Sequence, residues 1–175
     1  MTPVKFLQTQ MEKLAITDSL TGAYNRVALE DRIREEVKRS ELYEKPLSLI
    51  FFEIDFFKDV NDSFGHEAGD RTLIELSRIV QKNIRPMDFF ARYGGAEFAF
   101  LTPDADVVSA IGIAERIRRE VEQTLIDIVG RVTITCGVSQ FKEYDPADSE
   151  GVIVKMAMDA LYRARRQGGN RVLAW

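Results

Sequence analysis

Glu53 and Asp55 stand at the carboxyl end of an apolar stretch, residues 46–54, with one residue between them. A stretch of this length is typical of a buried strand, and acids two apart share a face if the strand continues past both. Mg²⁺ binds one or two carboxylates together with substrate phosphates. The pair therefore indicates a metal site, although an acid after a strand is also typical of a simple turn.

Residues 92–98 have the sequence Arg-Tyr-Gly-Gly-Ala-Glu-Phe, which places two glycines between apolar, strand-like flanks. A tight turn needs positive φ, and glycine adopts it without strain. The two glycines also leave no side chain above the turn, so a ligand can approach the backbone closely. We predict a β-hairpin with Gly94 and Gly95 at its tip.

The segment 56–70 carries four polar residues that suit a nucleotide. Lys58 can place a cation beside phosphates, and Asn61 and Asp70 can match the donor and acceptor edge of guanine. Taken by itself, Asp70 is better explained as the N-cap of a helix predicted over residues 70–84. His66, the only histidine, is equally suited to a structural role.

These motifs and several others resemble those of the GGDEF domains, the diguanylate cyclases, over residues 18–173. The matching segments are 18–26 (D-x-L-T-G-L-x-N-R), 53–70 (D-I-D-x-F-K-x-x-N-D-x-x-G-H-x-x-G-D), 85–88 (R-x-x-D), the hairpin 92–98, 114–118 (A-E-R-I-R) and 159–165 (D-x-A-L-Y-x-A-K). R-x-x-D alone is a weak signal, but here it stands at the family's distance ahead of the two glycines.

The resemblance implies that two GTP molecules are condensed into cyclic di-GMP by an antiparallel dimer, with Lys58 as a catalytic cation. It implies Mg²⁺ held by the acid at position 53, the carbonyl of Ile54 and the acid at position 96. The implied GTP contacts are Asn61, His66, Asp70, Gly94, Gly95 and Arg165. An inhibitory cyclic di-GMP site is implied at Arg85, Asp88 and Arg116, because guanidinium groups stack on bases and fork onto phosphate.

Besides Ala23 for leucine and Arg165 for lysine, three departures from the family pattern bear on catalysis. Ala96 replaces the acid that accepts the hydroxyl proton, and a positioned general base is worth roughly 10²–10⁴-fold in rate. Glu53 replaces Asp and carries its carboxylate one C–C bond, about 1.5 Å, farther out. Gly169 replaces a phosphate-facing arginine. Glu97 follows Ala96, but strand neighbours point to opposite faces, so we predict that it is poorly placed to substitute and that catalysis is weak or absent.

Helices and strands must position these residues. Helices are predicted over residues 26–39 (with Asn25 as N-cap), 70–84, 107–121 and 152–167, and strands over 46–54, 131–139 and 171–175 beside the hairpin. The resemblance implies an α+β, palm-like nucleotidyl-cyclase fold, in which helices flank a central, mostly antiparallel sheet of about five strands.

The N-terminal segment has apolar residues at heptad spacing, Val4, Leu7, Met11 and Leu14. We predict a linker or signalling helix over residues 1–17 and the GGDEF domain over residues 18–175. A helix docked on its own domain is the alternative, because two heptads are too few to establish a coiled coil.

Composition limits the classes of function. The chain has 175 residues, of which 45% are hydrophobic, enough for one packed domain. A net charge of -4 argues against nucleic-acid binding. The longest apolar run, residues 49–52, is too short to span a bilayer, and residues 1–5 lack the hydrophobic start of a signal peptide. The single cysteine, Cys136, cannot form an internal disulfide, so we expect a reducing compartment and a cytoplasmic domain without membrane contact. This expectation is compatible with membrane attachment of the full-length protein through another segment.

The expected ligands are GTP and cyclic di-GMP, with Mg²⁺ binding weakened or lost. The expected partners are a second copy of the chain and sensory or phosphodiesterase-type domains attached in the full-length protein. Two alternatives stay open. One is a functioning, slow cyclase in which Glu53 compensates, or an active enzyme in which Ala96 is an engineered change. The other is a structural dimerisation domain without nucleotide affinity.

Overall fold

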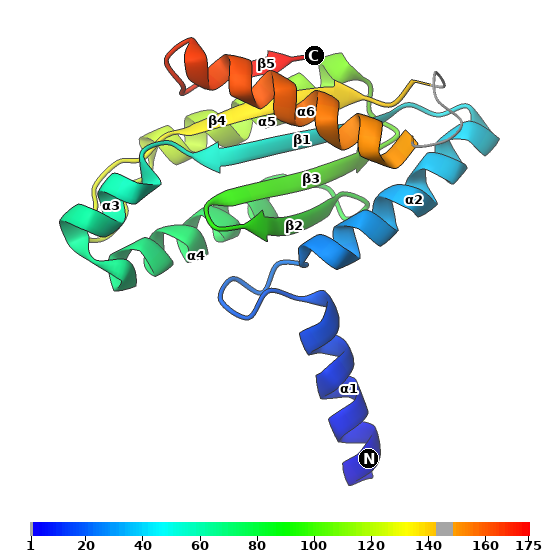
Figure 1. Ribbon diagram of the computed structural model, residues 1–175, viewed down its shortest axis with the longest axis horizontal. Helices are drawn as coiled ribbons and strands as arrows, with labels where there is room; N and C mark the ends of the chain where they lie inside the picture. Colours follow the sequence, from blue (N-terminus) through cyan, green and yellow to red (C-terminus); the bar gives the residue numbers. More distant parts are fainter. Residues whose placement is uncertain (1, 143–148) are drawn as a thin grey trace.

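The computed structural model describes residues 2–142 and 149–175, which form a five-stranded sheet between two layers of helices (Figure 1). The strands are β1 (Leu47–Ile54), β2 (Phe89–Gly94), β3 (Glu97–Pro103), β4 (Ile134–Gln140) and β5 (Val172–Ala174). The helices are α1 (Pro3–Ile16), α2 (Arg26–Tyr43), α3 (Phe57–Phe64), α4 (His66–Asn83), α5 (Val107–Gln123) and α6 (Ser149–Arg166). The strand order is β2-β3-β1-β4-β5, and only the β4–β5 pair is parallel. The predicted α+β fold is confirmed.

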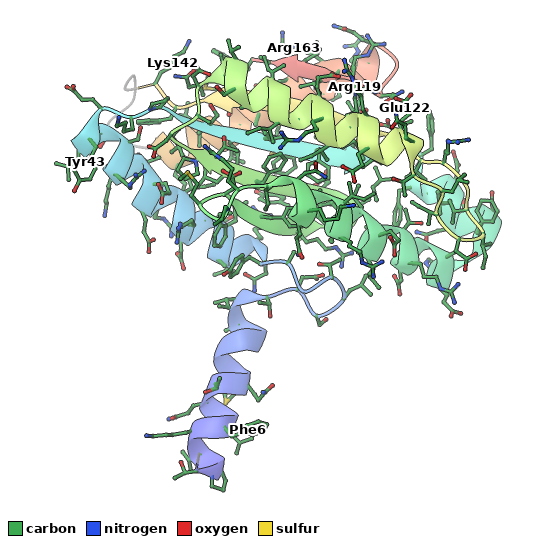
Figure 2. The ribbon with its side chains drawn as sticks, turned by 180° about the vertical axis from the view of Figure 1, so that it is seen from behind. Phe6, Tyr43, Arg119, Glu122, Lys142 and Arg163 are labelled. Atoms are coloured by element: carbon green, nitrogen blue, oxygen red, sulfur yellow. The ribbon has the colours of Figure 1, made fainter. Side chains whose placement is uncertain are left out.

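The central strand β1 is apolar throughout because helices cover both faces of the sheet. Alternate side chains of a strand point to opposite faces, so Ile50 and Phe52 pack with residues of α4 and α5. Leu49 and Phe51 pack with residues of α2 and α6 on the other face. Figure 2 shows α4 and α5 lying across the sheet from behind. The continuous apolar run in the sequence follows from this double burial.

Two helix boundaries near the expected site differ from the prediction. The helix predicted to begin at Asp70 begins at His66 as α4, and a separate helix, α3, precedes it. Gly65 divides the two helices, because its φ of 88° is a left-handed value that glycine adopts without strain. Asp70 therefore lies in the second turn of α4, and its interpretation as an N-cap is wrong. Asn25 does cap α2, as predicted, by accepting a hydrogen bond from the Ala28 amide.

Helix α1 extends away from the rest of the chain, and Phe6 lies on this isolated helix (Figures 1 and 2). Val4, Leu7 and Met11 are 64%, 60% and 68% exposed. The side chain of Leu14, the fourth member of the predicted pattern, lies outside the described part of the chain. The exposure contradicts the alternative in which this helix docks on its own domain. Within residues 2–142 and 149–175, no helix is long and apolar enough to cross a membrane.

Four segments meet at one edge of the sheet, on the left in Figure 1: the end of β1, the β2–β3 hairpin, the start of α3 and the end of α6. The sheet brings them together because β1 and β3 are antiparallel neighbours, so the end of one strand lies beside the start of the other.

Candidate functional site

A cleft of about 900 Å³ lies at this edge of the sheet. It is lined by residues 53–59, 94–97, 162, 165–166 and 168–169, which come from segments far apart in the chain. The structure thereby gathers a set of predicted site residues: Glu53, Ile54, Lys58, Gly94, Gly95 and Arg165. Ala96 lines the same cleft at the position where the family pattern has its acid.

Glu53 lies in the wall of the cleft as part of an ion pair. Its side chain is 15% exposed, and its Oε1 is 2.6 Å from Nε of Arg165. Burial raises the pKa of Glu53, the charge of Arg165 opposes this rise, and the carboxylates of Glu97 and Asp55 add to it. The guanidinium of Arg165 therefore neutralises the charge of Glu53, a carboxylate that lies near two other carboxylates.

Glu97 lies on the same face of the sheet as Glu53, because the two residues are direct partners in the antiparallel β1–β3 register. Glu97 also lines the cleft. The prediction that Glu97 points away from the site is therefore wrong. The alternation rule holds within a strand, but Ala96 belongs to the turn ahead of β3, so its position does not define the face on which Glu97 lies.

Asp55 anchors a loop inside the protein. Because β1 ends one residue before it, the condition for placing Glu53 and Asp55 on one face is not met. The Asp55 carboxylate accepts hydrogen bonds from the hydroxyls of Thr133 and Thr135 and from the backbone amide of Asn170 at 3.0 Å. These bonds tie the start of the 170–172 segment to the end of β1, and they occupy oxygens that a metal ion would need.

The loop after α6 explains the glycine at position 169. A Cβ there would lie 3.1 Å from the Asp55 carboxylate, and φ is +71°, so a larger residue would be strained. A cation that no sequence motif indicates lines the cleft nearby: Arg166, whose guanidinium carbon lies 5.9 Å from the centre of the Tyr162 ring. Its position directly after Arg165, in the last turn of α6, is the signal that could have identified it.

Arg92 anchors the tip of the hairpin. Its Nε and a terminal nitrogen donate to the carbonyl of Gly95 at 2.9 and 2.8 Å. Its other terminal nitrogen lies 3.2 Å from Asp18 Oδ1. Gly95 has a φ of +51°, as predicted for a glycine in this turn. Asp18 thus links the segment after α1 to the tip of the hairpin in the cleft.

We expect Asp18→Asn to lower the free energy of unfolding by about 1–2 kcal/mol at neutral pH, because Asp18 accepts hydrogen bonds from Thr21 and Arg92. Burial raises the pKa of Asp18, but the Thr21 hydroxyl and amide and the charge of Arg92 outweigh it and hold the pKa below its usual value. A lowered pKa in the folded state means that this stabilisation is present above about pH 4 and is lost as the pH falls through the folded value.

Urea unfolding at neutral pH and at about pH 3 measures the effect, and the difference between the two proteins should shrink in acid. Asp31→Asn, which removes an acid that is 65% exposed on α2, is the control and should change stability by less than about 0.5 kcal/mol. An equal loss for Asp18→Asn at both pH values would contradict the role of its charge.

The predicted guanine contacts lie on α3 and α4, outside the lining of the cleft. Asn61 packs against the first turn of α4, because a Cβ at Gly69 would overlap its Oδ1. Gly69 is therefore needed for the close approach of the two helices. This approach places Asn61 against Gly69, the residue before Asp70, whereas His66 is exposed at the start of that helix.

Arg85 and Asp88 form a closed turn between α4 and β2. The buried Asp88 carboxylate accepts hydrogen bonds from a terminal nitrogen of Arg85 at 2.7 Å and from its backbone amide at 2.8 Å. Arg85 also donates to the Pro103 carbonyl, and its side chain stays 38% exposed. Arg116, exposed on α5, donates to the carbonyl of Asn83, two residues before Arg85. The three predicted inhibitory-site residues therefore gather around the end of α4.

The residues in the cleft do not fit a divalent cation in the family's manner. Within the described residues, no three His, Cys, Asp or Glu side chains are grouped so that they could hold a metal ion. Glu53 is paired with Arg165, the side chain of Ala96 has no ligand atom, and the oxygens of Asp55 are hydrogen-bonded within the protein.

The chain matches the family model described as "Diguanylate cyclase, GGDEF domain" over residues 15–171. It is 39% identical over 166 residues to the response regulator PleD of Caulobacter vibrioides, covering 92% of this chain and 36% of PleD. It is 37% identical over 169 residues to the diguanylate cyclase DgcP of Pseudomonas aeruginosa, covering 95% of this chain and 25% of DgcP. The chain therefore spans only about a third and a quarter of the lengths of these relatives.

Solved structures share the fold. The coiled coil and GGDEF domain of DgcB from Caulobacter crescentus, in complex with c-di-GMP, gives a TM-score of 0.90 at 30% identity, covering 98% of this chain and 92% of that chain. The diguanylate cyclase SiaD of Pseudomonas aeruginosa, in complex with its activator SiaC, gives 0.87 at 32% identity, covering 98% of this chain and 66% of that chain. By sequence and by fold, this chain belongs to the GGDEF domain family.

Proposed function

We propose that this GGDEF domain is catalytically impaired and acts in cyclic di-GMP signalling as a nucleotide-binding module. The observation that carries the proposal is a contrast between two sites. The R-x-x-D turn has both of its motif residues, and Arg85 and Asp88 are joined by a hydrogen-bonded ion pair. In the cleft, by contrast, Ala96 places a methyl group where the family pattern has an acid. Calorimetric titration of cyclic di-GMP into the wild type and into arginine variants tests it.

Cyclic di-GMP binds at Arg85, Asp88 and Arg116 in this proposal. The two arginines are solvent-accessible, and a guanidinium can fork onto phosphate or stack on a base. The buried Asp88 holds Arg85 in place, which reduces the entropy lost when a ligand binds. The related DgcB domain was solved in complex with c-di-GMP, which supports this ligand.

GTP binds in the cleft, with its phosphates near Lys58 and Arg165 and its backbone contacts at Gly94 and Gly95. Guanine lies toward Asn61, His66 and Asp70 on α3 and α4. GGDEF cyclases generally use Mg²⁺, and we propose that its binding is weakened here, because the ligand positions at 53 and 96 are altered. In this proposal the cleft binds GTP but converts little of it to cyclic di-GMP.

In the full-length protein, residues 1–17 are proposed to be a signalling helix that connects the GGDEF domain to a sensory or phosphodiesterase-type domain. The direct link from Asp18 through Arg92 to the hairpin gives such a helix a physical route to the cleft. Nucleotide ligands and a single, buried, free cysteine fit a cytoplasmic location.

We expect the chain to form a homodimer through α1, because Val4, Leu7 and Met11 expose a continuous apolar stripe. Leu7→Glu should shift the protein toward the monomer by at least about tenfold in dissociation constant, measured by sedimentation velocity over a range of concentrations. Lys5→Glu, on the outer side of the same helix, is the control and should leave the dissociation constant unchanged. A dimer that survives Leu7→Glu would place the interface elsewhere.

A further inference from the structure

Arg165 lies in the cleft at the position where the family pattern has a phosphate-contacting lysine. Its Nε lies 2.6 Å from Oε1 of Glu53, whose side chain is 15% exposed, while the side chain of Arg165 is 54% exposed and lines the cleft. The family pattern has lysine at this position and an aspartate at position 53. The longer acid and the planar guanidinium together make a close pair that also satisfies the charge of Glu53.

The pair uses only part of what the guanidinium offers. An arginine has five N–H donors in a fixed fork, and the contact with Glu53 is made through Nε. Its terminal nitrogens are therefore free to donate to a phosphate in the cleft while the pair stays intact. Arg165 can thus bridge a carboxylate of the wall and a phosphate oxygen, which is the task of a bound metal ion.

Two further cations line the cleft, Arg166 from the last turn of α6 and Lys58 from the first turn of α3. Four carboxylates line the cleft as well: Glu53 is paired with Arg165, Asp55 accepts three hydrogen bonds within the protein, and Asp59 and Glu97 are the other two. A triphosphate entering the cleft therefore meets Lys58 and Arg166 together with the terminal nitrogens of Arg165.

We propose that this cleft binds the triphosphate of a guanine nucleotide without a divalent cation, with Arg165 in place of the metal ion. The inference rests on the proposed binding of GTP in the cleft, and it specifies how that site recognises the phosphates. It also gives a reason for the mismatch between this residue set and a metal site: the neutralising charge is built into α6.

The test is a calorimetric titration of GTP in excess EDTA and, separately, in Mg²⁺. The wild type should bind GTP in both buffers with dissociation constants that agree within about threefold. Arg165→Met should weaken binding in EDTA by at least about tenfold, because a charge-assisted, forked contact is lost. Arg163→Met is the matched control on the same helix; Arg163 does not line the cleft and should have no effect.

Binding by the wild type only when Mg²⁺ is present would overturn the inference while leaving GTP binding in the cleft intact. An unchanged affinity of Arg165→Met in EDTA would overturn it as well. Absence of GTP binding in both buffers would overturn both the inference and the proposed GTP site. Cyclic di-GMP titrated into the same samples reports separately on the proposed Arg85–Arg116 site, and circular dichroism shows that each protein is folded.

Discussion

The double variant Glu53→Asp/Ala96→Glu is expected to form cyclic di-GMP roughly 10²–10⁴-fold faster than the wild type. The new carboxylate at position 96 would enter the cleft at the tip of the hairpin, beside the residues that line it. Shortening Glu53 by one C–C bond, about 1.5 Å, would also draw its carboxylate away from Arg165, which now lies at 2.6 Å, and free it for Mg²⁺. Incubation with GTP and Mg²⁺ or Mn²⁺, followed by chromatography for cyclic di-GMP, measures the rate.

The control is Glu53→Asp/Ala96→Gln, which has a side chain of the same size at position 96 but no acid. It should stay at the wild-type rate if the gain comes from the carboxylate. A wild type that already forms cyclic di-GMP as fast as the Glu53→Asp/Ala96→Glu variant would contradict catalytic impairment and favour the functioning-cyclase alternative. In that case Glu97, directly opposite Glu53 across the β1–β3 register, would be the first residue to test as the substitute acid.

Arg116→Ala is expected to weaken cyclic di-GMP binding by roughly 10–100-fold, the worth of one or two charge-assisted hydrogen bonds. Arg116 is exposed and its contact within the protein is a hydrogen bond to the Asn83 carbonyl, so its removal should cost little stability. Arg85→Ala should lose affinity to a similar extent. The Arg85→Ala substitution should also lower stability, because the buried Asp88 carboxylate would lose its charged partner and keep only the hydrogen bond from the backbone amide of residue 85.

Calorimetric titration of cyclic di-GMP into the two variants and the wild type measures these losses, and circular dichroism establishes that the proteins are folded. Arg78→Ala, which removes a 64% exposed arginine of α4, is the matched control and should bind like the wild type. Absence of binding by the wild type would refute the receptor function, and dimerisation without any nucleotide affinity would favour the structural alternative. If Arg116→Ala binds cyclic di-GMP with the affinity of the wild type, α5 is not part of the cyclic di-GMP site.

Local features of the site could be predicted from the sequence because they depend on residues close together in the chain. The hairpin needs two glycines between apolar flanks, and Gly95 has the positive φ that this turn requires. The Arg85–Asp88 turn spans four residues, so the types of its two end residues and the spacing between them are enough to predict the turn. The N-cap at Asn25 and the buried strand β1 follow from equally local patterns. The break between α3 and α4 at Gly65 was missed, because the apolar periodicity alone does not locate a change of helix direction.

Contacts between distant segments were decided by tertiary structure alone. Glu97 faces Glu53 because β1 and β3 pair in one register, and a sequence does not state which residues of two strands become partners. Arg165 reaches Glu53 because α6 packs across the sheet and ends at the cleft. The sequence by itself therefore determined the family, the R-x-x-D and double-glycine motifs and the alanine at position 96 in place of the family's acid. Packing decided that Arg165 pairs with Glu53 in the cleft, because charges far apart in the chain meet only after the sheet and helices have assembled.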